Sequence, residues 1–218
     1  MAAQLTILGC GKLGKTLGLL LKGVPGIELC QVLNRSLESS TAAVRFLGAG
    51  AAIADYQALA PADYLLVGVP DDAIAGCAAR LAHSEAIRPG TIVFHCSGSQ
   101  PAGVLASVKD RGALIASIHP IRSFADPVLA AASFSGTGCA LEGDPPACET
   151  LTKLFRSMGA KVFPIAAPAK LVYHAGTVFA SNYLTVLIET SLRCFEQAGI
   201  ERSQAMECLL PLLEGTLA

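Results

Sequence analysis

Apolar runs alternate with helical patterns along roughly the first 165 residues of the chain. Runs typical of strands occupy residues 4–8, 27–33, 50–53, 63–69, 91–95, 113–118, 137–142 and 161–164. Between them, apolar residues recur at three- and four-residue spacing over 12–22, 37–47, 72–82, 101–110 and 146–158. This alternation predicts an α/β fold with a doubly wound, mostly parallel sheet and helices on both faces.

The pattern changes after the segment Pro164–Pro168. From Ala169 to about Gln197 only Gly176 could interrupt a helix, and Gly199 follows as a stop signal. A helix of roughly 28 residues is about 42 Å long, which exceeds a layer helix of a sheet. We therefore expect two domains, residues 1–165 and an α-helical C-terminal domain, 166–218, that begins with the long helix.

The composition is that of a globular domain without a general attraction for polyanions. The 218 residues are 52% hydrophobic and 15% charged, with a net charge of −1, so we expect neither nucleic acid nor a membrane as partner. We expect no apolar stretch of about 18 residues free of charge and proline, and a strand begins almost at the N-terminus, so we expect a cytoplasmic protein. The eight cysteines are scattered without metal-ligand spacing, and we expect no metal.

The first strand runs into the pattern Gly9-x-Gly11-x-x-Gly14. Such a loop between a strand and a helix binds the pyrophosphate of a dinucleotide, because glycines allow the tight turn and the close approach of phosphates to the helix N-terminus. The alternative is a glycine-rich turn that binds nothing. The motif predicts that the cofactor contacts Gly9, Cys10, Gly11, Lys12, Leu13 and Gly14.

The end of the second strand indicates which dinucleotide binds. It carries Asn34, Arg35 and Ser36 and no carboxylate, whereas NAD-binding sites usually place Asp or Glu there for the ribose hydroxyl. A guanidinium with small polar neighbours suits a 2′-phosphate, so we predict NADP(H). In the alternative interpretation, Ser36 only caps the next helix and Arg35 is solvated.

Further chemistry is expected where later strands end. After residues 63–69, Val69 and Pro70 bring backbone close to the cofactor, and Asp71 is better interpreted as a helix cap than as an acid. His95 could orient substrate or be structural. Ser97 lies in the small polar turn that follows His95.

The strand 113–118 leads into two more candidates. His119 precedes Pro120 and is held in an extended or turn geometry, and Arg122 supplies donors suited to an anion. We expect both residues to orient the substrate, and Arg122 suggests that the substrate is acidic.

A polar stripe runs along the long helix. Lys170, His174, Thr177 and Ser181 lie within about 60° of arc on an ideal helix, and Asn182 would join them only through a kink, for which Gly176 is the candidate. The stripe is either a solvated face or one wall of a cleft. In a cleft, Lys170 and His174 could polarise a carbonyl or imine and move the proton that accompanies hydride transfer.

Four segments carry a family resemblance: Phe94–Gly98, Ile118–Phe124, Cys139–Asp144 and Lys170–Tyr183. The chain resembles the superfamily of 6-phosphogluconate dehydrogenase, β-hydroxyacid dehydrogenases, ketopantoate reductase and pyrroline-carboxylate reductase, and within it a group of short bacterial Rossmann-like proteins labelled as oxidoreductases of unknown substrate. The resemblance implies a Rossmann-type domain, with pyrophosphate on the glycines, the 2′-phosphate on Asn34, Arg35 and Ser36, and Val69 and Pro70 lining the cofactor.

The resemblance also bears on catalysis and assembly. Lys170 matches a lysine of the superfamily, while His174 stands where several members have asparagine. Relatives usually continue with more helices, so the chain is either a fragment or a short member. The helical domain forms the dimer contact in the superfamily, and we expect a homodimer.

Two functions stay open at this point. The first is an NADP(H)-dependent oxidoreductase with Lys170 and His174 as catalytic residues and Ser97, His119, Arg122, Ser181 and Asn182 orienting a small substrate. The second is a non-catalytic dinucleotide-binding protein with a regulatory or scaffolding role.

Overall fold

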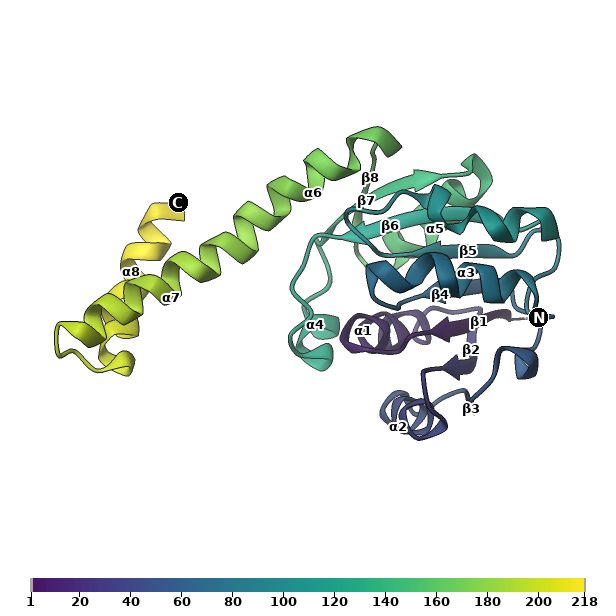
Figure 1. Ribbon diagram of the computed structural model, residues 1–218, viewed down its shortest axis with the longest axis horizontal. Coiled ribbons are helices and arrows are strands. Elements are labelled where there is room, and N and C mark those ends of the chain that lie inside the picture. The colour runs from purple at the N-terminus through teal and green to yellow at the C-terminus, as the bar shows by residue number, and fades with distance from the viewer. Residues whose placement is uncertain (1, 218) are drawn as a thin grey trace. The chain divides into compact units, whose positions relative to one another are not determined.

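The computed structural model describes residues 2–217 and contains one eight-stranded sheet (Figure 1). Its strands are β1 (Ala3–Leu8), β2 (Ile27–Leu33), β3 (Ala51–Ile53), β4 (Tyr64–Val67), β5 (Ile92–His95), β6 (Leu114–Pro120), β7 (Gly138–Gly143) and β8 (Lys161–Pro164). The strand order is β3-β2-β1-β4-β5-β6-β7-β8, and only the β6–β7 pair is antiparallel. The predicted α/β fold with a mostly parallel sheet is confirmed.

The central strand β4 is apolar and mostly buried because both faces of the sheet are covered there. In β4, Leu66 faces one core with α1, α2 and α5, while Leu65 and Val67 face the other core with α3 and the 3₁₀ segment η3. Residues on successive positions of a strand point to opposite faces, so a doubly covered strand shows no polar alternation.

The helices follow the predicted order with two additions. They are α1 (Lys12–Leu21), α2 (Leu37–Leu47), α3 (Ile74–Ala82), α4 (Pro127–Ala132), α5 (Pro145–Ser157), α6 (Lys170–Val178), α7 (Leu184–Gln197) and α8 (Arg202–Leu217). Short 3₁₀ segments are η1 (Tyr56–Ala58), η2 (Asp71–Ala73), η3 (Ala102–Arg111) and η4 (Ala167–Ala169). The sequence did not predict α4 or α8, and residues 102–111 form a 3₁₀ helix where an α-helix was expected.

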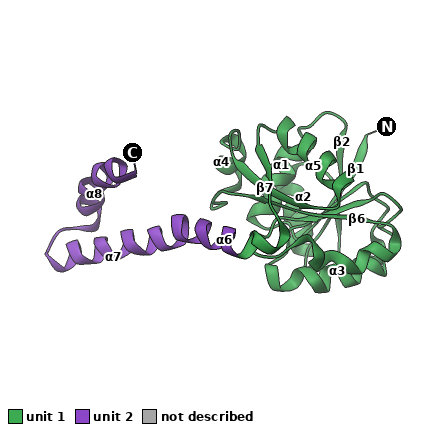
Figure 2. Ribbon diagram, turned by 90° about the horizontal axis from the view of Figure 1, so that it is seen from above, with its two compact units in different colours: residues 1–171 green, residues 172–218 purple. Residues whose placement is uncertain are grey.

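The chain divides into two compact units, residues 1–171 and 172–218 (Figure 2). This division falls six residues later than the boundary expected after residue 165. The reason is that Lys170, the first residue of α6, is buried and hydrogen-bonded within the first unit.

The long helix contains a π-helical turn. Residues 167–197 are helical without a gap, and η5 (Phe179–Tyr183) is the π-helical segment between α6 and α7. The irregularity therefore lies after Gly176, the position expected to kink. The rings of Phe179 and Tyr183 stack with centroids 4.9 Å apart.

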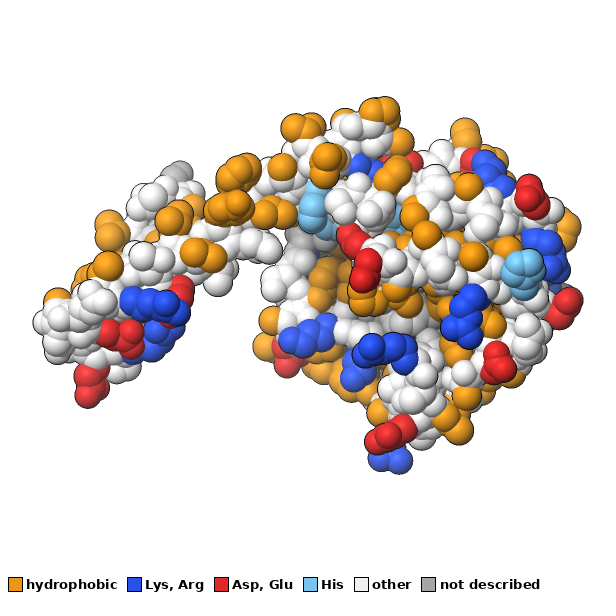
Figure 3. Space-filling view, viewed as in Figure 1, with side chains coloured by type: hydrophobic (Ala, Val, Ile, Leu, Met, Phe, Trp, Pro, Cys, Tyr) orange, Lys and Arg blue, Asp and Glu red, His pale blue; other side chains and the backbone are white. Residues whose placement is uncertain are grey.

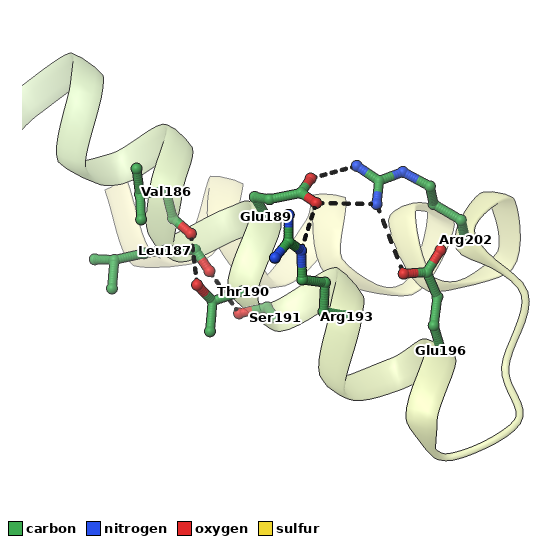
Figure 4. Close-up of polar contacts among 8 residues, drawn as sticks. All are labelled: Val186, Leu187, Glu189, Thr190, Ser191, Arg193, Glu196 and Arg202. Atoms are coloured by element: carbon green, nitrogen blue, oxygen red, sulfur yellow. Dashed lines mark hydrogen bonds and ion pairs between the residues drawn. The ribbon is translucent and has the colours of Figure 1, made fainter.

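The second unit has a small core of its own. Leu192 of α7 packs with Ala205 and Leu209 of α8. Figure 4 shows Glu189 of α7 held by Arg193 and by Arg202, which also lies 3.8 Å from Glu196. These ion pairs are exposed, so the apolar contact contributes more to the packing of the two helices.

Apolar side chains cover much of the visible face of α6 and α7 (Figure 3). Residues 167–197 are long and apolar enough to cross a membrane by length and composition, so the expectation that no such stretch occurs was wrong. A single helix of this kind is weak evidence for a membrane span. The exposed side chains include Phe179, Val186 and Leu187. Large exposed apolar surfaces of this kind mark interaction sites in many proteins.

Candidate functional site

The glycine-rich loop packs against the end of β4. Gly9 has a φ of +85°, and a Cβ there would lie 2.7 Å from the Gly68 carbonyl carbon and from Val69. A Cβ on Gly14 would lie 2.6 Å from the Gly9 carbonyl oxygen. Glycine is therefore required at 9 and 14 for the fold itself, since a side chain would meet backbone.

Gly11 differs from these two glycines because a Cβ there would meet nothing within 4 Å. It lies in front of α1 as the N-cap, with no side-chain cap and no acidic residue in the first turn. Lys12 is exposed beside it, while Leu13 is half-buried. Free N–H groups at a helix N-terminus form an anion site, so this loop fits the pyrophosphate of a dinucleotide.

The amide of Asn34 ties this loop to the start of α2. The Cys10 N–H donates to Asn34 Oδ1 at 2.6 Å, and Asn34 Nδ2 donates to the Ser39 carbonyl at 2.9 Å. Burial raises the pKa of the Cys10 thiol to about 11, so it stays protonated. Asn34 is thus primarily a bridge between two loops.

Arg35 and Ser36 follow on the exposed side of this bridge. Ser36 is the N-cap of α2 and accepts from the Ser39 N–H in a capping box, so the capping interpretation is confirmed for Ser36. Arg35 is exposed and has no hydrogen bond or ion pair within residues 2–217. A phosphate could therefore reach its guanidinium.

The ammonium group of Lys170 lies beside the end of β5 and the middle of β6. Its side chain is only 1% exposed, and Nζ donates to the Ser97 carbonyl at 3.1 Å and to Ser117 Oγ at 2.8 Å. Burial lowers the pKa of Lys170, and the carboxylate of Glu142 partly opposes this shift. Lys170 is thus part of a buried polar cluster and does not lie on a solvated face.

His95, at the end of β5, is a structural histidine. It is fully buried, Nδ1 accepts from the Ser97 N–H at 3.1 Å, and Nε2 lies 3.3 Å from the Pro101 carbonyl. These contacts assign the proton to Nε2 of a neutral ring. Burial lowers the pKa of His95 to about 4.

Asp71 has a role that the sequence did not indicate. It is not a side-chain cap of η2, and its Oδ2 accepts from Ser97 Oγ at 2.6 Å and from Ser99 Oγ at 3.0 Å. The one available signal was position, because Asp71 and the two serines follow the neighbouring parallel strands β4 and β5. Val69 and Pro70 precede Asp71 at this edge, where Val69 abuts Gly9.

Arg122 is not free to bind an anion as expected. Its Nη1 donates to the Ser133 carbonyl at 2.6 Å and to Thr137 Oγ1 at 3.3 Å, and Nη2 donates to Ser133 Oγ. The guanidinium therefore fastens the end of α4 to the loop after β6. His119 is half-buried near the end of β6.

The remaining predicted residues belong to the second unit. His174 is half-buried, and its Nδ1 lies 3.2 Å from Thr177 Oγ1. Ser181 and Asn182 are exposed in the π-helical turn.

A groove of about 620 Å³ lies elsewhere on the first unit, between α5 and the strands β7 and β8. It includes Glu142, Cys148 and Phe163 but neither Lys170 nor any residue of the loop 9–14. Glu142 Oε1 accepts from the Ala102 N–H at 2.6 Å, and burial raises the pKa of its carboxyl group. This groove is distinct from the glycine-rich loop.

Comparisons with known proteins agree with this arrangement. Residues 2–120 match the family described as Rossmann-like domain, and residues 137–218 match the domain of unknown function DUF2520. No curated protein matches the chain.

Three solved structures are similar over nearly the whole chain. BF3122 of Bacteroides fragilis, described as a candidate NADP oxidoreductase, has a TM-score of 0.79 at 18% identity over 99% of this chain and 79% of its own. TM1727 of Thermotoga maritima has a TM-score of 0.71 at 25% identity over 97% and 76%. The 1-pyrroline-5-carboxylate reductase of Streptococcus pyogenes has a TM-score of 0.74 at 18% identity over 99% and 78%.

These likenesses show the fold of NAD(P)-dependent oxidoreductases, while the first 120 residues carry the family assignment. The glycine-rich loop with its open Gly11 and the sheet order agree with that assignment. The chain belongs to the Rossmann-like domain family.

Proposed function

We propose that the protein is an NADP(H)-dependent oxidoreductase that exchanges a hydride with a small carbonyl, hydroxyl or imine compound. One observation carries the proposal. The open face of Gly11 at the start of α1 and the buried cluster of Lys170, Ser97 and Asp71 all occur at the carboxyl ends of parallel strands of one sheet. Ligands of doubly wound sheets bind at that edge.

The choice of NADP(H) over NAD(H) rests on the end of β2. Arg35 is exposed and unpaired within residues 2–217, and no carboxylate follows the strand. Asn34 holds the loop in position, and Ser36 caps α2. A planar guanidinium binds a phosphate through paired N–H groups, so Arg35 is the proposed 2′-phosphate ligand.

Lys170 and His174 are the proposed proton donors. Two N–H groups of Lys170 are used by Ser97 and Ser117, which leaves the third for a substrate oxygen or nitrogen. A lowered pKa makes a lysine a better acid. NADPH supplies the hydride when bound, and the protein supplies binding and orientation. Because Arg122 is engaged by Ser133 and Thr137, it gives no support for an acidic substrate.

We also propose that the protein acts in the cytoplasm as a homodimer formed through the second unit. Leu187 is 64% exposed and Phe179 is 63% exposed on a helix whose own core involves only α8. Glu189, Arg193 and Glu196 interrupt the apolar surface, which favours another protein chain over a lipid interior.

Titration with NADPH and NADH, followed by nucleotide fluorescence, tests the cofactor proposal. We expect Gly11→Ala to weaken NADPH binding without lowering Tm, because its methyl group meets no protein atom but occupies the space for phosphates. Arg35→Ala should raise the Kd for NADPH about tenfold, equivalent to roughly 1.4 kcal/mol, and leave that for NADH unchanged. Gly76→Ala, which also meets no atom within 4 Å, is the control.

The outcomes separate the candidate functions. Equal affinity of the wild type for both nucleotides would refute the role of Arg35, and absence of binding would refute the oxidoreductase proposal. A turnover screen over ketones, alcohols, imines and hydroxy acids then tests catalysis. Binding without any turnover would favour a regulatory dinucleotide-binding protein.

A further inference from the structure

We propose that Asp71 determines substrate specificity at this site by binding a protonated amino group of the substrate. The inference rests on the proposed oxidoreductase function and adds the class of substrate. The two oxygens of the Asp71 carboxylate have different surroundings.

The Asp71 carboxylate is held from one side only. Oδ2 accepts from the hydroxyl groups of Ser97 at 2.6 Å and Ser99 at 3.0 Å, while Oδ1 has no hydrogen bond within residues 2–217. The residue as a whole is exposed. The two serine hydroxyl groups fix the Asp71 side chain before a ligand binds. Oδ1 can still accept a hydrogen bond from that ligand.

The two serines are themselves firmly supported. Ser97 is 6% exposed, and its Oγ accepts from the Gln100 N–H at 3.0 Å. Its N–H donates to buried His95, and its carbonyl accepts from Lys170. Every polar atom of Ser97 is thus occupied, so its hydroxyl cannot bind substrate without releasing Asp71. We therefore assign Ser97 a positioning role toward Asp71.

The position of Asp71 places it beside the proposed cofactor loop. Asp71 lies three residues after Gly68, which packs closely on the glycine-rich loop: a Cβ added at Gly68 would lie 2.5 Å from the Gly9 carbonyl oxygen. The contact with Ser97 and Ser99 joins the loops after β4 and β5. A group bound at Oδ1 is consequently held next to the glycine-rich loop.

The balance of available charge favours a cation. Arg122 is bound to Ser133 and Thr137, and His95 is neutral. Lys170 is buried and donates two of its three N–H groups to Ser97 and Ser117, so a single cationic N–H remains for a ligand. Asp72, next to Asp71, is also exposed, and its side chain has no hydrogen bond or ion pair within residues 2–217. An ammonium group pairs with such a carboxylate, whereas a substrate carboxylate would be repelled.

The test uses three alcohols that share one skeleton: isopropanolamine, sec-butanol and lactate. Each is assayed with NADP⁺ and with the wild type, Asp71→Asn and the matched control Asp72→Asn, and further such triplets extend the panel. The hydroxyl carbon gives its hydride to NADP⁺ and the hydroxyl proton leaves to solvent, so each alcohol yields a carbonyl compound and NADPH. Asparagine keeps an oxygen for both serines, and NADPH titration checks that each variant binds cofactor.

We expect the wild type to prefer the amino member, and Asp71→Asn to lower kcat/KM about tenfold for that member alone, mainly through KM. Asp72→Asn should match the wild type. An equal loss for all three alcohols, or weaker NADPH binding, would show a structural or cofactor role and overturn the proposal. Turnover without preference for the amine would overturn it while the oxidoreductase function stands. If NADPH binds and no triplet member or other screened compound reacts, the proposed function fails and this inference fails with it.

Discussion

His95 illustrates what a single residue in a strand end can reveal. The sequence left open whether it orients substrate or supports the fold, and its buried contacts with Ser97 and Pro101 decide for the fold. A histidine at the end of an apolar run does not specify its partners, because these depend on the path of the following loop. The structural need for glycine at 9 and 14 was predictable, since a tight turn and the close packing of a helix on it make a local demand on residue type.

The depressed pKa of His95 predicts a specific loss of stability in acid. The folded-state pKa is about 4 against an ordinary value of 6.5, so the unfolded chain takes up a proton first as the pH falls. The free energy of unfolding is therefore unaffected by His95 above pH 6.5. Between pH 6.5 and pH 4 it falls by up to about 3 kcal/mol, because the unfolded chain binds the proton more tightly. Urea unfolding of the wild type and His95→Asn at several pH values measures it. An equal decline in both proteins would contradict the assignment.

Other residues of the site could not be derived from the sequence. Asp71 meets serines 26 and 28 positions away, Asn34 meets Cys10 across 24, and Arg122 meets Ser133 across 11. Sequence position placed these residues at strand ends, but only the fold pairs them. Lys170 was predicted from its type and place on the long helix, and its contact with Ser117, 53 positions away, required the structure.

At the scale of elements, strands were more predictable than interruptions of helices. All eight strands occur near their predicted positions, because strands covered on both faces leave long apolar runs. The six-residue α4 is too short for a periodic signal, and η3 shows a helical pattern with 3₁₀ geometry. The π-helical turn left no signal, because its extra residue does not interrupt an apolar stretch.

The π-helical turn predicts the effect of a one-residue deletion. Removing Ala180 should convert i→i+5 bonds in residues 179–183 to i→i+4 bonds and leave the following α7 in nearly the same orientation, because the π-helical turn accommodates one extra residue. Helix content by circular dichroism and the proposed dimer should therefore both be preserved. Sedimentation velocity measures the assembly. A monomeric deletion variant of a dimeric wild type would show that the π-helical turn itself contributes to the contact.

At the scale of the whole molecule, the helical C-terminal region was predicted and its boundary was not. Length and the lack of breakers indicated the helix, but the burial of Lys170 assigns the first residues of α6 to the first unit. The homodimer stays a prediction, which we base on the exposed apolar side chains of the second unit.

A charged substitution on this surface tests the homodimer. We expect Leu187→Glu to give monomers, because a carboxylate buried in an apolar contact lacks a partner. Gln197→Glu adds the same charge at an exposed position where α7 ends and should leave the dimer intact. Sedimentation equilibrium measures both. Flotation of the wild type with lipid vesicles, or a monomeric wild type, would contradict the proposal.

The complete occupation of Ser97 limits what the usual alanine scan can teach about this enzyme candidate. Removing its hydroxyl leaves Asp71 with one tether, and any shift of its peptide groups is transmitted to Lys170 and His95. Inactivity of a Ser97→Ala protein would therefore mix three effects and could be mistaken for loss of a direct substrate contact. Roles around this turn are therefore assigned first from variants of the exposed Asp71, and only afterwards from variants of the buried Ser97 and Lys170.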